Sequence, residues 1–350
     1  MNKRSTTKRS DTSSHLVQRD WSRRKFTQLA MAGTASAIAL LRAAPGQTET
    51  PAPAIRVSFI SPFVRPAGPS LMLDRFKAAL RALGWTESDT FIIESRFAAG
   101  QLQTIPEYVS ELSRLDVKAF YVSGSQAAAI VKQATTIPVV MIGDPVGANL
   151  AASFDRPGGT VTGLASVTQD ICGKRLALLK DVAPDVTRAA FVANPEHPAT
   201  PSILHMTKPV AEVLGIELVA IDVRSEKDME AAFDTMAKAG ISCFIFYPVP
   251  MSDDRFRQLA DIAIQRRLLW SDEIPRDATL GALLSYGPDY PELAQRAAGY
   301  VDKILKGTSP ADLPIGVPDK FELVANLKTA KDLGISIPES VLSQATKVVR

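Results

Sequence analysis

One local pattern recurs along most of the sequence: a short β-branched run, a loop of small and polar residues, and a segment with helical spacing. In its first occurrence residues 55–60 form the run, and Leu73, Phe76 and Leu80 share one face of the helical segment. Further apolar runs lie at 91–93, 119–122 and 138–142, and after residue 159 the series starts again at 189–192, 217–221, 241–246 and 268–270. Alternating strands and helices form parallel sheets with right-handed crossovers. The sequence therefore predicts an α/β protein with two doubly wound parallel-sheet lobes.

The N-terminal segment predicts an export signal rather than a part of the fold. Arg23 and Arg24 precede an uncharged run of small and apolar residues at 29–41. That run is shorter than the roughly 20 apolar residues that a membrane span needs, so it fits the apolar region of a twin-arginine signal. We expect residues 1–54 to be this signal and its linker, and the protein to reach the periplasm by the twin-arginine route. An amphipathic helix of the folded domain is the alternative, and the cleavage site stays open.

Removal of this segment reverses the charge balance. The chain has 40 Lys and Arg against 37 Asp and Glu; residues 1–54 hold nine and three of these, which leaves 31 and 34, a net charge of −3. The basic character thus belongs to the signal, and we expect no nucleic-acid partner. Cys172 and Cys243 are too few for a disulfide framework and are expected to be buried thiols, with a single bridge as the alternative.

The residues needed for catalysis or metal binding are scarce. Of the three histidines only His197 and His205 lie outside the signal. Two histidines are few for a metal cluster or for histidine-based catalysis. The sequence also lacks GxGxxG, a P-loop, CxxC and GxSxG. We therefore expect no catalytic residue, no metal and no cofactor.

Candidate ligand-binding residues follow the predicted strands, at the edge where open parallel sheets bind their ligands. They are Ser61, Ser123, Gly124, Ser125, Asp144, Asn194, Tyr247 and Asp272. The turn from Ser123 to Ser125 joins a strand to an Ala-rich helix, so its hydroxyls and backbone N–H groups could hold a carboxylate. Ordinary N-capping is the alternative role for either serine.

Asp144 stands in the segment "MIGDPVGANL", where a buried strand ends. A half-buried carboxylate stays ionised best beside a cation, which indicates an acceptor for a ligand ammonium group. Asp before Pro is also a common turn starter, and that structural role is the alternative.

Two helix starts carry capping signals. Asp289 precedes a helix that begins at Tyr290, with Glu292 at capping-box spacing, and is expected to be a cap rather than a ligand residue. Thr104 and Glu107 have the same spacing and predict a second capping box.

Three separated segments carry a family resemblance: "MIGDPVGANLAASFDRPGGTVTG" at 141–163, "LLSYGPDYPELAQRAAGYVDKIL" at 283–305 and "PDKFELVANLKTAKDLGISIPESVL" at 318–342. They resemble the substrate-binding proteins of ABC transporters, in the branch similar to tryptophan and aromatic amino-acid binders. The resemblance implies a type I periplasmic binding-protein fold whose two lobes, joined by a hinge of three crossovers, close on a ligand. The expected lobes are 55–162 with 285–315, and 163–284 with 316–350.

The resemblance adds Tyr286 to the candidate site. Tyr247 and Tyr286 would stack on an aromatic or apolar ligand body, or alternatively pack under a loop. The chain departs from the family pattern at Ala148-Asn149 and at Phe154-Asp155, and Arg65 could instead face an anionic ligand.

The function that these observations predict is that of a monomeric solute receptor. It would bind a small polar ligand, an amino acid or a related compound, and deliver it to an ABC permease in the membrane. An exported enzyme with a bound cofactor and a sensor module that feeds a receptor are the alternatives.

Overall fold

The computed structural model describes residues 54–66, 70–247 and 249–350, which all belong to one compact unit, Pro51–Arg350. The predicted export signal and linker at 1–54 lie outside the described residues except for Ala54, and residues 67–69 of the first loop and Pro248 after Tyr247 also lie outside them.

The first sheet has five strands, all parallel, in the order β2-β1-β3-β4-β5. They are β1 (Ile55–Ser61), β2 (Phe91–Phe97), β3 (Val117–Ser123), β4 (Val139–Gly143) and β5 (Val161–Ala165). Most of their residues are buried apolar side chains, as expected of a sheet that helices cover on both faces.

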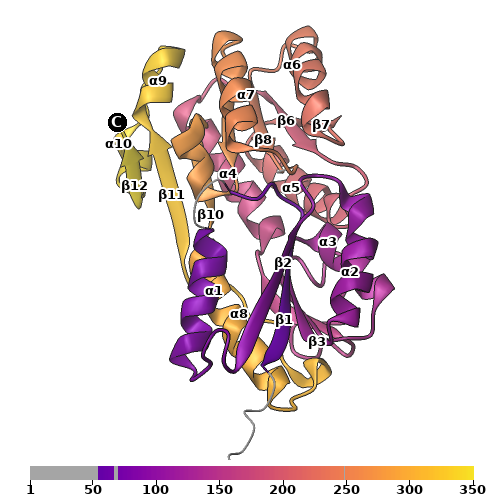
Figure 1. The fold of residues 1–350 in the computed structure, drawn as a ribbon. Coiled ribbons are helices and arrows are strands. Elements are labelled where there is room, and N and C mark those ends of the chain that lie inside the picture. The colour runs from indigo at the N-terminus through magenta and orange to yellow at the C-terminus, as the bar shows by residue number, and fades with distance from the viewer. Residues whose placement is uncertain (1–53, 67–69, 248) are drawn as a thin grey trace, which may run out of the picture. The chain divides into compact units, whose positions relative to one another are not determined.

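Helices cover both faces of this sheet (Figure 1). The helices α1 (Leu71–Ala82) and α8 (Tyr290–Leu305) pack together on one face, although more than half of the chain separates them. The helices α2 (Ile105–Arg114) and α3 (Ser125–Ala134) cover the other face.

The second sheet has seven strands in the order β12-β11-β10-β9-β8-β6-β7. They are β6 (Arg188–Ala193), β7 (Glu217–Asp222), β8 (Cys243–Phe246), β9 (Leu269–Asp272), β10 (Leu284–Pro288), β11 (Phe321–Asn326) and β12 (Lys347–Val349). The pair β10 and β11 is antiparallel and every other pair is parallel. Parallel pairing thus dominates both sheets.

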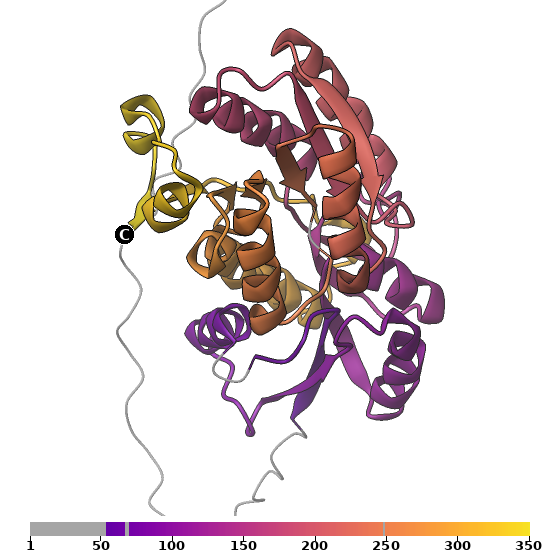
Figure 2. The same cartoon turned by 90° about the horizontal axis from the view of Figure 1, so that it is seen from above.

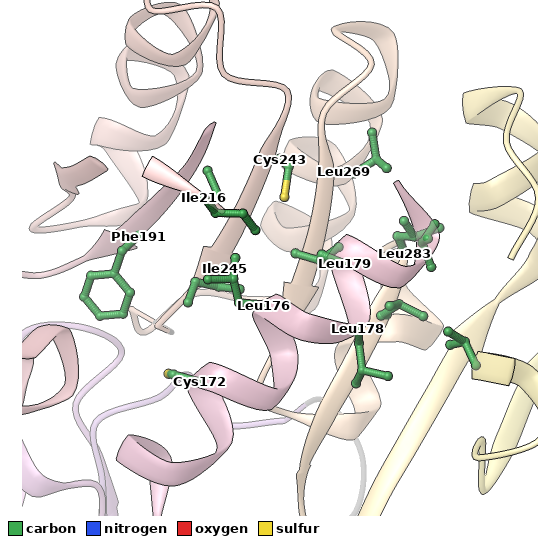
Figure 3. Close-up of a cluster of buried hydrophobic side chains, with 14 of the residues drawn as sticks. Cys172, Leu176, Leu178, Leu179, Phe191, Ile216, Cys243, Ile245, Leu269 and Leu283 are labelled. Carbon is green, nitrogen blue, oxygen red and sulfur yellow. The ribbon is translucent and has the colours of Figure 1, made fainter. Parts of the chain in front are cut away.

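The helices of the second sheet also lie on two faces (Figure 2). They are α4 (Thr168–Val182), α5 (Thr200–Val213), α6 (Met229–Lys238), α7 (Asp253–Gln265), α9 (Leu327–Leu333) and α10 (Glu339–Leu342). Four short 3-10 segments, η1 (Leu102–Thr104), η2 (Glu226–Asp228), η3 (Pro275–Leu280) and η4 (Pro310–Asp312), complete the described elements. On one face, Leu176 and Leu179 of α4 pack with Ile245 of β8 and Leu283 (Figure 3).

The two cysteines lie in this same apolar cluster as free thiols. Burial raises the pKa of Cys172 to about 11 and that of Cys243 to about 12, so both stay protonated at neutral pH. The expectation of buried thiols agrees with this arrangement, and the alternative of a bridge between them does not.

The chain leaves each sheet a few residues beyond the predicted lobe boundaries. All of β5, to Ala165, pairs with β4 in the first sheet, and all of β10, to Pro288, pairs within the second. The expected boundaries at 163 and 285 would therefore cut both strands. The chain passes between the sheets three times: after β5, between β10 and α8, and between η4 and β11.

Candidate ligand-binding site

Most of the predicted site residues lie where the strands end. Ser61 and Ser123 are the last residues of β1 and β3, and Asp272 is the last of β9. Asp144, Asn194 and Tyr247 each follow directly after a strand, β4, β6 and β8 respectively. Since parallel strands end at a common edge, these side chains occupy the loops from which such sheets bind ligands.

Tyr286 is placed differently. It lies in the middle of β10, where its ring stacks on Phe321 of β11 at 5.8 Å between centroids and 17° between planes. The antiparallel pair of strands therefore gives this ring a partner within the protein, on a neighbouring strand rather than under a loop.

Asp144 and Ser125 form one buried unit. The Ser125 hydroxyl oxygen accepts the backbone N–H of Asp144 at 2.8 Å, and Asp144 Oδ1 accepts the N–H of Gly147 at 2.8 Å. Gly124 precedes α3 with a φ of +85°, a conformation that glycine adopts without strain, and its N–H bonds to Ile142. The turn role of Asp144 is thus real, and it fixes the carboxylate beside the start of α3.

Asn194 and Ser61 also bond to their own loops. Asn194 Oδ1 accepts the N–H of Glu196 at 2.9 Å, and Ser61 Oγ accepts the N–H of Phe63 at 3.2 Å. These short-range bonds are typical of polar residues that shape turns. Arg65 places its guanidinium 4.5 Å from the centre of the Phe97 ring, a cation–π contact that gives this cation a partner inside the protein.

Tyr247 contacts a residue that the sequence did not single out. Its hydroxyl lies 3.3 Å from Nε2 of His197, and the two rings meet edge to face at 4.8 Å. Burial raises the pKa of Tyr247 well above its ordinary value, and the negative charges of Glu273 and Asp144 raise it further. The charge of Asp144, which follows β4 of the first sheet, thus acts on Tyr247, which follows β8 of the second.

Glu273 is the second residue that sequence reasoning missed. It follows β9 and is almost completely buried. Its Oε1 accepts hydrogen bonds from Thr168 Oγ1 at 2.8 Å and from the Tyr290 hydroxyl at 2.5 Å. Burial raises the pKa of this carboxyl, while the nearby Arg175 opposes the shift. The only sequence signal was its place directly after the candidate residue Asp272.

Hydrogen bonds connect Glu273 to the loop that carries Asp144. The Thr168 hydroxyl donates its proton to Glu273. It must therefore act as the acceptor in its second hydrogen bond, in which the Ser166 hydroxyl donates at 2.8 Å. The backbone N–H of Ser166 in turn donates to the carbonyl of Gly143 at 2.5 Å. A short bonded path thus runs from the end of β4, through the first crossover, to the end of β9.

Arg175 supports the two neighbouring loops of the second sheet. Its side chain is fully buried, and its guanidinium donates to the carbonyl oxygens of Phe246 at 2.5 Å and Ser271 at 2.6 Å. These two residues immediately precede Tyr247 and Asp272. The arginine therefore fixes the spacing between the two loops through the last strand residues that precede them.

Asp272 serves its own loop. It is fully buried, and its Oδ1 accepts the N–H groups of Glu273 at 2.7 Å and Ile274 at 3.2 Å. Burial raises the pKa of Asp272. The pKa of Asp277 is raised well above its ordinary range, first by burial and then by the nearby negative charge of Asp272. This geometry favours a loop-forming role for Asp272.

Among residues 54–66, 70–247 and 249–350, no group of three or more His, Cys, Asp or Glu side chains could hold a metal ion. Within the same residues, no helix is long and apolar enough to cross a membrane.

The two sheets, their flanking helices and the three connections between them define a type I periplasmic binding-protein fold. The chain belongs to the family described as ABC transporter substrate binding protein, whose model matches residues 60–349. This membership confirms the resemblance predicted from the three sequence segments. The family consists of solute-binding proteins, so the chain is a binding protein and not an enzyme.

Individual relatives agree with the family. The "Tyrosine-binding protein" of Clostridioides difficile (strain R20291) is 24% identical over 267 residues, which cover 74% of this chain and 75% of the relative. The structure of an ABC domain in complex with L-Trp from Streptococcus pneumonia has a TM-score of 0.76 at 23% identity, over 85% of this chain and all of the other. A conserved domain protein from Vibrio cholerae O1 biovar El Tor has a TM-score of 0.74 at 25% identity, over 84% and 99%.

Proposed function

We propose that this protein is the periplasmic receptor of an ABC importer, and that its two lobes close on an α-amino acid. The single observation that carries the proposal is that Asp144 and Tyr247 each directly follow a strand, β4 of the first sheet and β8 of the second, and so lie at the ligand-binding edge of their sheets. A ligand that both lobes contact stabilises the closed arrangement, because it binds that arrangement more tightly than the open one.

The charged groups of an amino acid match the proposed site. Asp144 supplies a buried carboxylate for the ligand ammonium group. The start of α3 at Ser125 supplies backbone N–H groups, and a helix N-terminus favours a carboxylate. Tyr247, which is only partly buried and follows β8 of the second sheet, offers an aromatic ring.

The relatives support an aromatic side chain on the ligand. One is named for tyrosine and another was solved with L-Trp. Their identities to this chain are low, so we propose the class of aromatic amino acids rather than one member of it.

Calorimetric titration of the purified protein with L-tyrosine, L-tryptophan, L-alanine, benzoate and ribose tests the ligand class. We expect the aromatic amino acids to bind and the other compounds to bind at least tenfold more weakly. A ligand at a hundred times its dissociation constant should also add about 2.7 kcal/mol to the free energy of unfolding. Binding of ribose or benzoate in preference to amino acids would refute the proposed ligand.

Asp144→Asn tests the ammonium contact, because the amide keeps the size of the side chain and removes its charge. Loss of a hydrogen bond to a charged group costs about 1.5–3 kcal/mol, so we expect affinity for the amino acid to fall roughly ten- to a hundredfold. Asp155→Asn is the matched control, since Asp155 is exposed on a nearby loop. Equal affinities of the two variants would rule out the contact.

Export and delivery are parts of the same proposal. Residues 1–54 act as a twin-arginine signal, the mature protein is a monomer in the periplasm, and an ABC permease is its partner. Replacing Arg23 and Arg24 by lysine should leave the protein in the cytoplasm, which cell fractionation measures. Uptake of labelled amino acid should then fall as well; unchanged uptake would favour a sensory role over import.

A further inference from the structure

The hydrogen bonds of His197 determine which ring nitrogen carries its proton. The backbone N–H of Ala199 donates to Nδ1 at 3.1 Å, so Nδ1 must be the unprotonated nitrogen. Burial lowers the pKa of His197 to about 4, and the ring is therefore neutral at neutral pH. Its single proton is on Nε2.

This tautomer fixes the direction of the bond to Tyr247. Nε2–H faces the Tyr247 hydroxyl at 3.3 Å, so histidine is the donor and the phenolic oxygen is the acceptor. The phenol cannot give its own proton to His197. Because the phenol stays protonated well above neutral pH, its O–H remains a donor for another group.

Tyr247 and Glu273 directly follow the neighbouring parallel strands β8 and β9, at the same edge of the second sheet. The charges of Glu273 and of Asp144, which follows β4 of the first sheet, act on the Tyr247 phenol. Glu273 already accepts two hydrogen bonds, from Thr168 and Tyr290. A hydroxyl donor after a strand of the second sheet and a carboxylate after a strand of the first match the carboxylate and the ammonium group of an α-amino acid.

We propose that Tyr247 determines specificity by donating its hydroxyl proton to the carboxylate of an α-amino acid, and that His197 is the residue that positions it for this bond. The inference rests on the proposed function and extends it, since it assigns the carboxylate a partner in the second sheet. The ligand ammonium, next to Asp144, offsets the negative charge around the phenol.

Tyr247→Phe tests the donor, with the ring kept and only the hydroxyl removed. L-tyrosine is titrated against tyramine, which has the same ring and ammonium group but no carboxylate. We expect the variant to bind L-tyrosine ten- to a hundredfold more weakly than the wild type and tyramine with unchanged affinity. Unchanged binding of L-tyrosine, or an equal loss for both compounds, would overturn the inference.

Two variants of His197 distinguish its role in positioning Tyr247 from its role in the structure of its own loop. His197→Gln keeps an N–H donor at the reach of Nε2, whereas His197→Asn keeps an acceptor at the position of Nδ1 and loses the donor. We expect the Gln variant to retain most of the preference for L-tyrosine over tyramine and the Asn variant to lose it. His205→Gln on the exposed side of α5 is the matched control. Loss of the preference in both His197 variants, or in neither, would contradict the positioning role.

Nitrogen-15 NMR of the imidazole rings tests the tautomer without any ligand. We expect His197 to show a protonated Nε2 and an unprotonated Nδ1 at pH 7; the reverse would overturn the inference by itself. The two proposals fail differently. A wild type that binds no amino acid removes the proposed function, whereas one that binds L-tyrosine with no effect of Tyr247→Phe removes this inference alone.

Discussion

Thr168 Oγ1 donates a hydrogen bond of 2.8 Å to Glu273 Oε1, and both side chains are buried. Thr168 begins α4 just after the first crossover, while Glu273 follows β9. The same Glu273 oxygen accepts the hydroxyl proton of Tyr290, at the start of α8 just after the second crossover. One carboxyl group therefore joins two of the three connections between the sheets.

The first prediction concerns the pH dependence that Glu273 imparts. Its pKa is raised in the folded protein, so the native state binds more protons than the unfolded chain above the ordinary value of 4.5. Stability from this group is therefore present below that pH and is lost as pH rises through the folded pKa. In Glu273→Gln, which cannot ionise, this loss should disappear. Urea unfolding of both proteins at pH 4 and pH 7.5 measures it, and a parallel pH dependence in the two would contradict the prediction.

The second prediction concerns His197, whose shift has the opposite effect. Burial lowers its pKa from 6.5 to about 4, so the unfolded chain binds a proton that the native state does not. The contribution of His197 to the free energy of unfolding should be fully present above pH 6.5. The free energy of unfolding should then fall by about 3 kcal/mol as the pH drops to 4. His197→Gln should lack this decrease, whereas His205→Gln should keep it. Denaturant titrations at several pH values provide the measurement.

The third prediction concerns the bond between Ser125 and Asp144. Ser125→Ala leaves the buried N–H of Asp144 without its acceptor, which should cost about 1–3 kcal/mol of folding free energy. Ligand affinity should fall as well, because this bond orients the loop. Ser113→Ala, an exposed position in α2, should change stability by less than about 0.5 kcal/mol. Two variants of equal stability would show that the bond contributes nothing.

The fourth prediction compares two glycines. A methyl group on Gly287 of β10 would collide with the backbone carbonyl of Glu273, so Gly287→Ala should cost about 2 kcal/mol or more. Gly299 lies inside α8 with open space around its Cα, so Gly299→Ala should stabilise the protein by about 0.5–1 kcal/mol. Thermal unfolding of the two variants decides; a tolerated Gly287→Ala would mean that β10 can shift.

The regular parts of the fold could be predicted from local sequence. Apolar runs and helical spacing located the parallel strands and their covering helices. The cap at Asp289 was correct, since its side chain accepts the N–H of Glu292 at 3.0 Å. The cap at Thr104 was wrong: its hydroxyl donates to the carbonyl of Gln101, because the preceding segment η1 is already helical.

The site could be predicted only in part, because strand ends are visible in the sequence and their partners are not. Asp144 and Tyr247 were found as residues that follow strands. His197 and Glu273 were missed as partners, since their roles depend on bonds to residues 50 and 105 positions away. The placement of Tyr286 was missed because an antiparallel pair within parallel sheets leaves no local signal.

The buried guanidinium of Arg175 has a consequence for how such a receptor can diverge. It binds the backbone carbonyls of Phe246 and Ser271, not their side chains, so the frame it provides does not depend on which residues occupy the two loops. If these loops bind the ligand as proposed, substitutions at Tyr247 or in the residues after Asp272 should alter ligand preference while the distance between the loops stays constant. Ligand preference can therefore change during evolution without loss of the contacts that hold the two loops in place.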